Sequence, residues 1–184
     1  GIIGYQLSAL METNGMRYYS TVRSCSTNVT IMGNAGCVYG VGGIAGAVRS
    51  YDENIAAMII NCYTTGDIEG AMRAGGIVGL LYPYGSVTNS YATGYVDGYT
   101  RLGNDPDYGD FRYAYAGGIA GELNYDAIIA NSFFTGEVSA RAAAGSNYAV
   151  EGEIAGFIGK GGNEGGAYIQ SEKGLIYNCV SAAD

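Results

Sequence analysis

Two short phrases alternate along this 184-residue chain, and their repetition constrains the fold more than any other feature. One phrase reads NCYTTGDIEG at 61–70, NSYATGYVDG at 89–98 and NSFFTGEVSA at 131–140, with weaker copies at 24–31 and 178–184. The other reads GGIAG at 42–46, GGIVG at 75–79 and GGIAG at 117–121, with GIIG at 1–4 and GEIAG at 152–156. The copies recur every 33 to 42 residues, which is typical of an array built from one repeated structural unit.

Aligned copies of the first phrase share columns of similar residues. Two positions before the Asn stands a β-branched column, which consists of Val22, Ile59, Val87, Ile129 and Ile176. The residue between this column and the Asn varies freely, as expected of a position that faces solvent. Apolar and variable residues in alternation, with β-branched side chains, predict a strand.

A second β-branched column, Ile68, Val96 and Val138, follows nine residues after the first. Because nine is odd, both columns face the core only if the alternation of side chains reverses once between them. One interpretation puts the reversal at Thr-Gly, where glycine accepts a bend, and turns the Asn column and the aromatic column (Tyr63, Tyr91 and Phe133) inward. The alternative puts the corner at Asn, the Cys/Ser column inward and the rings outward. We favour inward rings, because they bury more apolar area than thiols and hydroxyls do.

Strand phrases separated by fixed glycines and by insertions predict an all-β fold, a right-handed parallel β-helix or β-solenoid of about five turns. A single turn cannot bury its own apolar face, so the turns stack about 4.8 Å apart and like residues lie on like. We expect residues 1–184 to form one repeat domain, with turns at approximately 1–41, 42–74, 75–116, 117–151 and 152–184. The chain begins inside one phrase and ends inside the other, so we expect it to be a piece of a longer protein.

Composition excludes several classes of function. The net charge of −8 and the scattered arginines argue against a nucleic-acid-binding surface. No stretch of about 18 apolar residues is present, so we expect no membrane insertion by this segment. The chain has no histidine, which excludes Ser-His-Asp catalysis and an H-E-x-x-H zinc site within it. We therefore predict that the chain is not an enzyme.

The paired phrases G-G-I-[AV]-G and N-[CS]-[YF]-x-T-G-x-[IV] resemble the GLUG motif repeat of bacterial surface proteins. Such repeats occur in filamentous-haemagglutinin-like adhesins and in non-catalytic regions of IgA-specific metalloendopeptidases. The resemblance implies an extracellular structural or adhesive module of a bacterial surface or secreted protein. This sequence departs from the pattern at Glu153, where Gly is expected, and after Asn178, where Thr-Gly is missing.

The four cysteines, Cys25, Cys37, Cys62 and Cys179, have no C-x-x-C spacing that would suggest zinc or redox chemistry. Three of them share a column with serine, which indicates a need for a small side chain. We predict free thiols. A disulfide between Cys25 and Cys62 is the alternative, but stacked Cβ atoms about 4.8 Å apart exceed the usual separation for one.

Two groups of residues are candidates for binding. The acidic loop GNDPDYGD at 103–110 offers Asn104, Asp105, Asp107 and Asp110 to Ca²⁺, although a solvated turn is the simpler interpretation, and we expect no other cofactor. Tyrosines outside the repeat columns suit a sugar or a protein surface, although they also suit the cover of loops within the domain. They are Tyr82, Tyr84, Tyr99, Tyr108 and Tyr113, with Tyr115 beside them.

Taken together, these features predict a non-catalytic adhesive solenoid module, located on the bacterial cell surface or secreted. Expected partners are a host glycan or protein surface, flanking repeats of the same chain, or a second copy stacked end to end. One alternative is a carbohydrate-active β-helix, similar to a polysaccharide lyase, with its site near residues 101–115 and with Arg101 and Arg112 beside the acidic loop. Another alternative is an accessory region of a secreted metalloprotease.

Overall fold

The computed structural model describes residues 1–11, 16–33, 40–100, 104–105, 109–110, 113–124, 126–142, 151–155, 158–161 and 175–182. Within these residues every regular element is a β-strand, as the repeat predicts. They therefore contain no helix that could cross a membrane. Five sheets with parallel stacking form the body, and one short antiparallel pair lies apart from them.

The chain passes through the five sheets in a constant order, from sheet 1 to sheet 5. Sheet 1 contains β1 (Ile3–Met11), β2 (Met16–Tyr18), β7 (Ala45–Ser50), β12 (Val78–Leu81), β19 (Ala120–Leu123) and β24 (Ile158–Gly161). Sheet 2 contains β3 (Ser20–Arg23), β8 (Ala57–Ile60), β13 (Gly85–Thr88), β20 (Ile128–Ala130) and β25 (Leu175–Tyr177). Sheet 3 contains β4 (Ser26–Thr27), β9 (Tyr63–Thr64), β14 (Tyr91–Ala92), β21 (Phe133–Phe134) and β26 (Val180–Ser181).

The remaining sheets complete the circuit. Sheet 4 contains β5 (Ile31–Met32), β10 (Ile68–Ala71), β15 (Val96–Thr100) and β22 (Val138–Ala142). Sheet 5 contains β6 (Val41–Gly42), β11 (Arg73–Gly75), β18 (Tyr113–Gly117) and β23 (Glu151–Ala155). The separate pair is β16 (Asn104–Asp105) with β17 (Gly109–Asp110).

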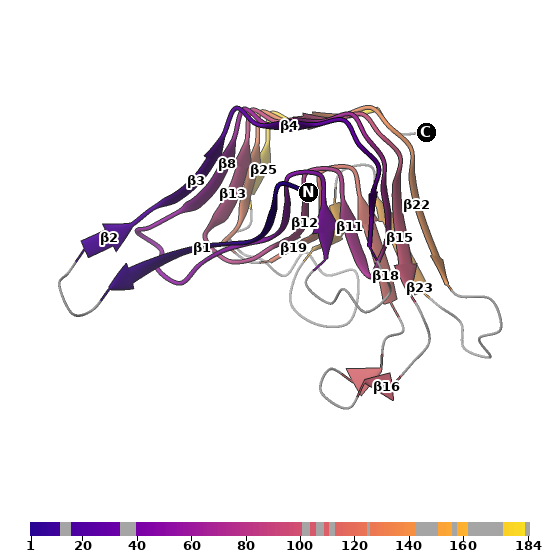
Figure 1. Ribbon diagram of the computed structural model, residues 1–184, viewed down its shortest axis with the longest axis horizontal. Helices are drawn as coiled ribbons and strands as arrows, with labels where there is room; N and C mark the ends of the chain where they lie inside the picture. The colour runs from indigo at the N-terminus through magenta and orange to yellow at the C-terminus, as the bar shows by residue number, and fades with distance from the viewer. Residues whose placement is uncertain are drawn as a thin grey trace.

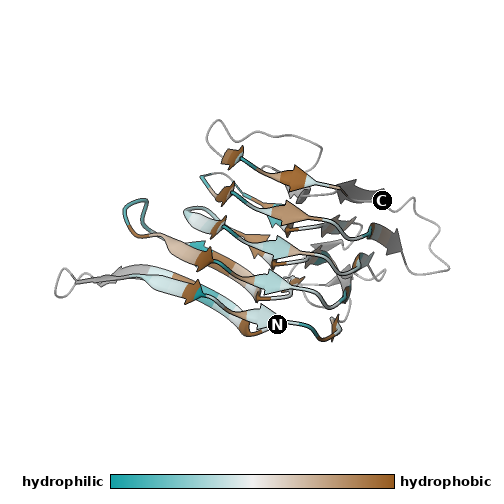
Figure 2. Ribbon diagram, turned by 90° about the horizontal axis from the view of Figure 1, so that it is seen from above, coloured by the Kyte–Doolittle hydropathy of each residue, from teal (hydrophilic) through white to brown (hydrophobic). Residues whose placement is uncertain are grey.

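Seen along the coil in Figure 1, sheet 2 forms the left wall, sheet 3 the top and sheet 4 the right wall, while sheets 5 and 1 turn back into the middle. The chain runs up the left wall, across the top and down the right wall while it recedes from the viewer, which is a right-handed coil. Figure 2 shows the successive strands of sheet 3 lying one above another, with the more apolar strands toward the C-terminus. The fold is the parallel β-solenoid that the repeat predicts.

The strand register places like residues on like. The last turn departs from the alignment made on the sequence, because Glu153 pairs with Tyr115 and Gly117 pairs with Ala155, so Glu153 does not stand in the column of Gly118 as predicted. Ile59 pairs with Val22 on one side and with Val87 on the other, and Val87 pairs with Ile129. In sheet 4, Ile68, Val96 and Val138 are paired in the same way. The buried core contains residues of both columns. They are Val22, Ile59, Val87 and Ile129 in sheet 2 and Ile68, Val96 and Val138 in sheet 4. The two β-branched columns therefore do face one interior, as predicted.

The corner between these columns lies at the Asn column, so the predicted position at Thr-Gly is wrong. Asn61, Asn89 and Asn131 have φ of 55°, 51° and 49°, a left-handed conformation that asparagine tolerates better than most residues. After the corner, Cys62 is 1% exposed and Tyr63 is 38% exposed. The Cys/Ser column is thus inward and the rings are outward, which corrects the interpretation that we favoured from the sequence.

Hydrogen bonding at the corner explains why small side chains face inward there. Ser90 Oγ donates to the carbonyl of Thr88 at 2.9 Å, and Ser132 Oγ donates to that of Ala130 at 2.8 Å. The backbone N–H of Ser90 in turn donates to Ser132 Oγ at 3.2 Å. Since a buried polar backbone group without a partner costs about 1–3 kcal/mol, a small hydroxyl or thiol at this place stabilises the bend, and a ring cannot replace it.

The GGI[AV]G phrase forms the inner turn between sheets 5 and 1, directly beneath sheet 3. A Cβ atom on Gly76 would lie 2.6 Å from the Cβ of Ala92 in β14 and 2.1 Å from the carbonyl oxygen of Gly118. Glycine is required because the inner turn is in direct contact with sheet 3. The inward residues of sheet 3 fill what space is left, and they include Phe134, which is fully buried beside the exposed Phe133.

Candidate functional site

The outer face of sheet 3 carries three parallel rows of outward side chains. An Asn row lies at the corner, an aromatic row follows on the strands, and a Thr row follows the strands. Their members are Asn61, Asn89 and Asn131; Tyr63, Tyr91 and Phe133; and Thr65, Thr93 and Thr135. All of these residues are exposed except Tyr91, which is half-buried between its two neighbours. We call this surface the ladder face.

The rings of the ladder face are stacked. The ring centroids of Tyr63 and Tyr91 are 4.9 Å apart with an interplanar angle of 3°, and those of Tyr91 and Phe133 are 4.8 Å apart with an angle of 4°. This spacing equals the strand separation, so the rings follow directly from the register. Because the rings cover each other's faces, they present mainly their edges to the outside.

The tyrosines proposed from the sequence for binding lie on different parts of the coil where the structure describes them. Tyr82 and Tyr84 lie in the connection between sheets 1 and 2, where Tyr84 has a φ of 59°. Tyr99 lies on β15 in sheet 4. Tyr113 lies on β18 in sheet 5, but its side chain is outside the described residues, as is the whole of Tyr108. Binding by these tyrosines stays a prediction.

The acidic loop forms a small antiparallel pair, with Asn104 opposite Asp110 and Asp105 opposite Gly109. The side chains of this pair and the whole of Asp107, Arg101 and Arg112 lie outside the described residues. Elsewhere in the described part of the chain, no group of three acidic or cysteine side chains could hold a metal ion. Calcium binding by the loop stays a prediction.

The described cysteines are free thiols, as predicted. Cys62 is buried, whereas Cys25 and Cys179 are half-buried. Burial raises the pKa of the Cys62 thiol, and its Sγ donates to the carbonyl of Ile60 at 3.3 Å. These thiols therefore act as the small donors of the corner, like the serines of the same column.

Two buried charged groups were not anticipated from the sequence. Glu122 on β19 is ion-paired with Arg73 on β11, so the pair joins sheets 1 and 5. Asp97 on β15 is fully buried and accepts a hydrogen bond from Ser139 Oγ at 2.7 Å. Alignment of the second phrase puts Glu122 one residue after Gly121, where two other copies have Ala47 and Leu80, so the alignment is only a weak signal of the pair.

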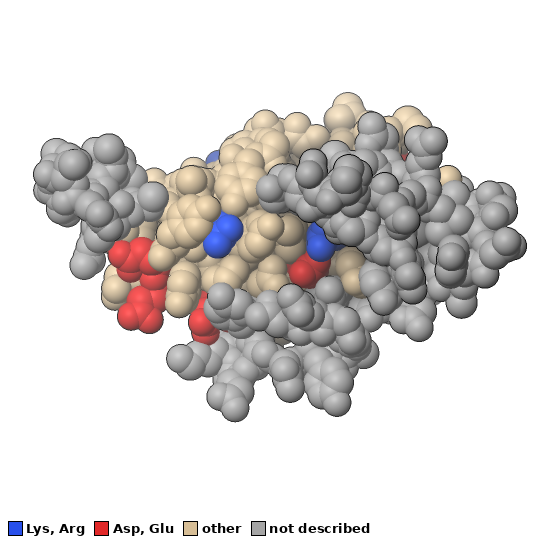
Figure 3. Space-filling view, turned by 90° about the horizontal axis from the view of Figure 1, so that it is seen from below, with Lys and Arg blue, Asp and Glu red and all other residues tan. Residues whose placement is uncertain are grey.

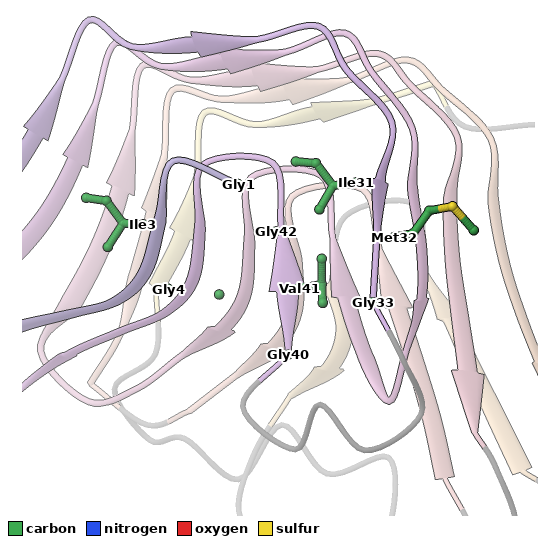
Figure 4. Close-up of a pocket in the computed structure, with 10 residues that line it drawn as sticks. Gly1, Ile3, Gly4, Ile31, Met32, Gly33, Gly40, Val41 and Gly42 are labelled. Atoms are coloured by element: carbon green, nitrogen blue, oxygen red, sulfur yellow. The ribbon is translucent and has the colours of Figure 1, made fainter.

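The N-terminal end of the coil contains a cavity of about 490 Å³ between β1, β5 and β6. It is lined by glycines and by apolar side chains, which include Ile3, Ile31 and Val41. Ile31 and Met32 lie on opposite sides of β5 in Figure 4, and Met32 is 77% exposed. An apolar end of this kind agrees with the end-to-end stacking expected from the sequence, which stays a prediction.

Comparison with known proteins places this geometry in context. Residues 70–97, which run from the end of β10 to β15 and include one copy of each phrase, match the family described as the GLUG motif. The chain contains a GLUG motif. The GLUG segment stacks in register on the copies before and after it, so the motif corresponds to a part of one turn of the solenoid.

A crystal structure described as a "putative immunoglobulin A1 protease" from Bacteroides ovatus is similar to this chain, with a TM-score of 0.61 and 22% sequence identity. The match covers 99% of this chain and 48% of that one, so the chain spans about half the length of that protein. At this identity the likeness establishes the fold. No curated protein sequence matches the chain.

Proposed function

We propose that this chain is a non-catalytic structural and adhesive module of a secreted or surface-anchored bacterial protein. The GLUG motif and the solenoid fold support a module that spaces other parts of a longer chain. The observation that carries the adhesive part is the ladder face, where large rings are exposed in an ordered row on a protein surface.

The ladder face fits a protein partner better than a sugar. A sugar ring stacks on the open face of an aromatic ring, but the faces of Tyr91 are covered by Tyr63 and Phe133. Ring edges flanked by rows of Asn and Thr form a ribbed surface with apolar and hydrogen-bonding groups side by side. Tyrosine and phenylalanine are enriched at the centres of protein interfaces, where such a surface is covered.

Immunoglobulin A1 is a rational first probe, because the similar crystal structure is described as a "putative immunoglobulin A1 protease". We suggest interferometry of immobilised immunoglobulin A1, human mucin and albumin with the chain, together with a variant that carries Tyr91→Ser and Phe133→Ser. A variant with Tyr19→Ser, an exposed tyrosine outside the ladder face, is the matched control. We expect binding to at least one of the first two surfaces, at least tenfold weaker for the ladder variant and unchanged for the control.

Equal binding by the ladder variant and the parent chain would contradict the adhesive role of the ladder face. The same preparation should be incubated with acidic polysaccharides and assayed for new unsaturated ends, since turnover would instead support the alternative lyase-like site near residues 101–115. Cleavage of immunoglobulin A1 by the isolated chain would contradict the non-catalytic part of the proposal.

A further inference from the structure

Arg49 lies on β7 of sheet 1, and its side chain is half-buried. Figure 3 shows the molecule from below, where single basic groups lie among uncharged atoms and a few acidic groups. The guanidinium carbon of Arg49 lies 4.1 Å from the ring centroid of Tyr51 and 4.9 Å from that of Tyr82. Its Nε atom is buried and has no hydrogen-bond partner among the described residues. Among the residues whose side chains are described, no carboxylate pairs with it.

Arg73 provides a contrast with Arg49. Arg73 also approaches a tyrosine, with its guanidinium carbon 5.9 Å from the ring centroid of Tyr115, but it is ion-paired with Glu122. Acidic residues outnumber basic ones by 17 to 9 in the chain, so carboxylates are not scarce. A cation held in place by two rings and without an anion has unused capacity for a charge-assisted hydrogen bond.

The neighbours of Arg49 add the other features of a binding site. Along the coil, Arg49 pairs with Leu7 on β1, and a backbone hydrogen bond from Tyr82 to Val48 puts Tyr82, directly after β12, next in the same row. Leu7 is 45% exposed, and Tyr51 beside the row is 60% exposed. An apolar side chain, a cation and a ring therefore follow one another at the strand spacing of about 4.8 Å.

We propose that this row binds a saccharide that bears a carboxylate. The guanidinium can donate two parallel hydrogen bonds to the carboxylate, which is the geometry that arginine provides and lysine does not. The open part of the Tyr51 ring can pack against the apolar C–H face of a sugar. This surface lies on sheet 1, so the proposal does not rest on the ladder face of sheet 3.

An acidic peptide fits this surface less well. A peptide that adds to a sheet needs a free strand edge, whereas β7 is hydrogen-bonded to β1 on one side and to β12 on the other. Only side chains are therefore available at the centre of the row, and they present one cation beside a ring.

The test is titration calorimetry of the whole chain with 3′-sialyllactose, tetragalacturonate, lactose and tetraglutamate. We expect a Kd below about 1 mM for at least one of the two acidic saccharides, and binding to lactose at least tenfold weaker. The first two ligands distinguish a sialate from a uronate. Arg49→Gln should weaken binding at least tenfold, whereas Arg23→Gln, which removes the same charge from an exposed site on β3, should leave it unchanged.

Several outcomes would overturn the proposal. They are no binding of either acidic saccharide at 10-fold the expected Kd, equal losses in the Arg49→Gln and Arg23→Gln variants, and binding of tetraglutamate as tight as that of the saccharides. Unfolding temperatures of the variants control for misfolding. If Arg49→Gln fails to fold, Tyr51→Ala replaces it, because Tyr51 is largely exposed, and it should weaken saccharide binding at least threefold.

Discussion

The inner turn under sheet 3 permits a sharp test of the packing, by replacement of Gly76 with alanine. The new Cβ atom would lie 2.1 Å from the carbonyl oxygen of Gly118 and 2.6 Å from the Cβ of Ala92, both well inside contact distance. Overpacking in a core usually costs about 1–3 kcal/mol. Here the obstacle is backbone, and Gly76 N–H donates to the carbonyl of Gly117 at 3.2 Å, so a shift also weakens a hydrogen bond worth about 1 kcal/mol.

We therefore expect Gly76→Ala to lower the free energy of unfolding by at least about 3 kcal/mol, or to prevent folding. Gly4→Ala is the matched control, because a Cβ on Gly4 meets no heavy atom within 4 Å, and its effect should stay within about 0.5 kcal/mol. Urea unfolding followed by circular dichroism measures both variants. If the free energy of unfolding of Gly76→Ala lies within about 1 kcal/mol of that of the parent chain, the inner turn does not contact sheet 3 and the packing described here is wrong.

Three further outcomes test the corner and the buried groups. Asn131→Ala should cost about 1–2 kcal/mol more than Asn131→Gly in urea unfolding, because only glycine replaces asparagine at a φ of 49° without strain; equal costs would argue against a left-handed corner. Arg73→Met should cost about 2–4 kcal/mol because it leaves the buried carboxylate of Glu122 without a partner, and the double variant Arg73→Met/Glu122→Leu should recover most of that loss; no recovery would mean that the pair is not the cause. Because burial raises the pKa of the Cys62 thiol, the folded state holds this proton more tightly than the unfolded state, so the free energy of unfolding should fall as the pH rises above about 8.5. Cys62→Ser should flatten that fall, and an unchanged pH dependence would show that another group causes it.

The coil and its register could be predicted from the sequence because stacked turns force similar residues into the same column. The β-branched columns before and after the Asn column are the clearest examples, and both are buried except at Ile176 in the last turn. The direction of the side chains was predicted wrongly because buried area was weighed without the hydrogen bonds of the corner. An Asn in four of the five copies is itself a signal of a left-handed residue, and it points to the correct corner.

The candidate sites were harder to predict. Arg49 and Tyr82 each stand three residues after the last glycine of the second phrase, so the alignment does put them in one column. However, the approach of Tyr51 depends on the turn after β7, which is longer than the corresponding turns after β12 and β19. Features outside the repeated phrases come from insertions, and the stacking of like residues does not determine their conformation.

The most direct test of the account compares two adjacent positions on opposite faces of sheet 3. The test uses a chain whose four cysteines are replaced by serine, since serine already occupies the Cys/Ser column at Ser90 and Ser132. The single variants Ser90→Cys and Tyr91→Cys of this chain are treated with a maleimide in the folded state and in urea. We predict that the folded Tyr91→Cys variant reacts almost as fast as in urea, because it lies on the ladder face. We predict that the folded Ser90→Cys variant reacts at least 100-fold more slowly than in urea, because Ser90 is 1% exposed. Fast labelling at position 90 with protection at position 91 would show that the rings face the interior. That result would contradict both the corner at Asn and the ladder face.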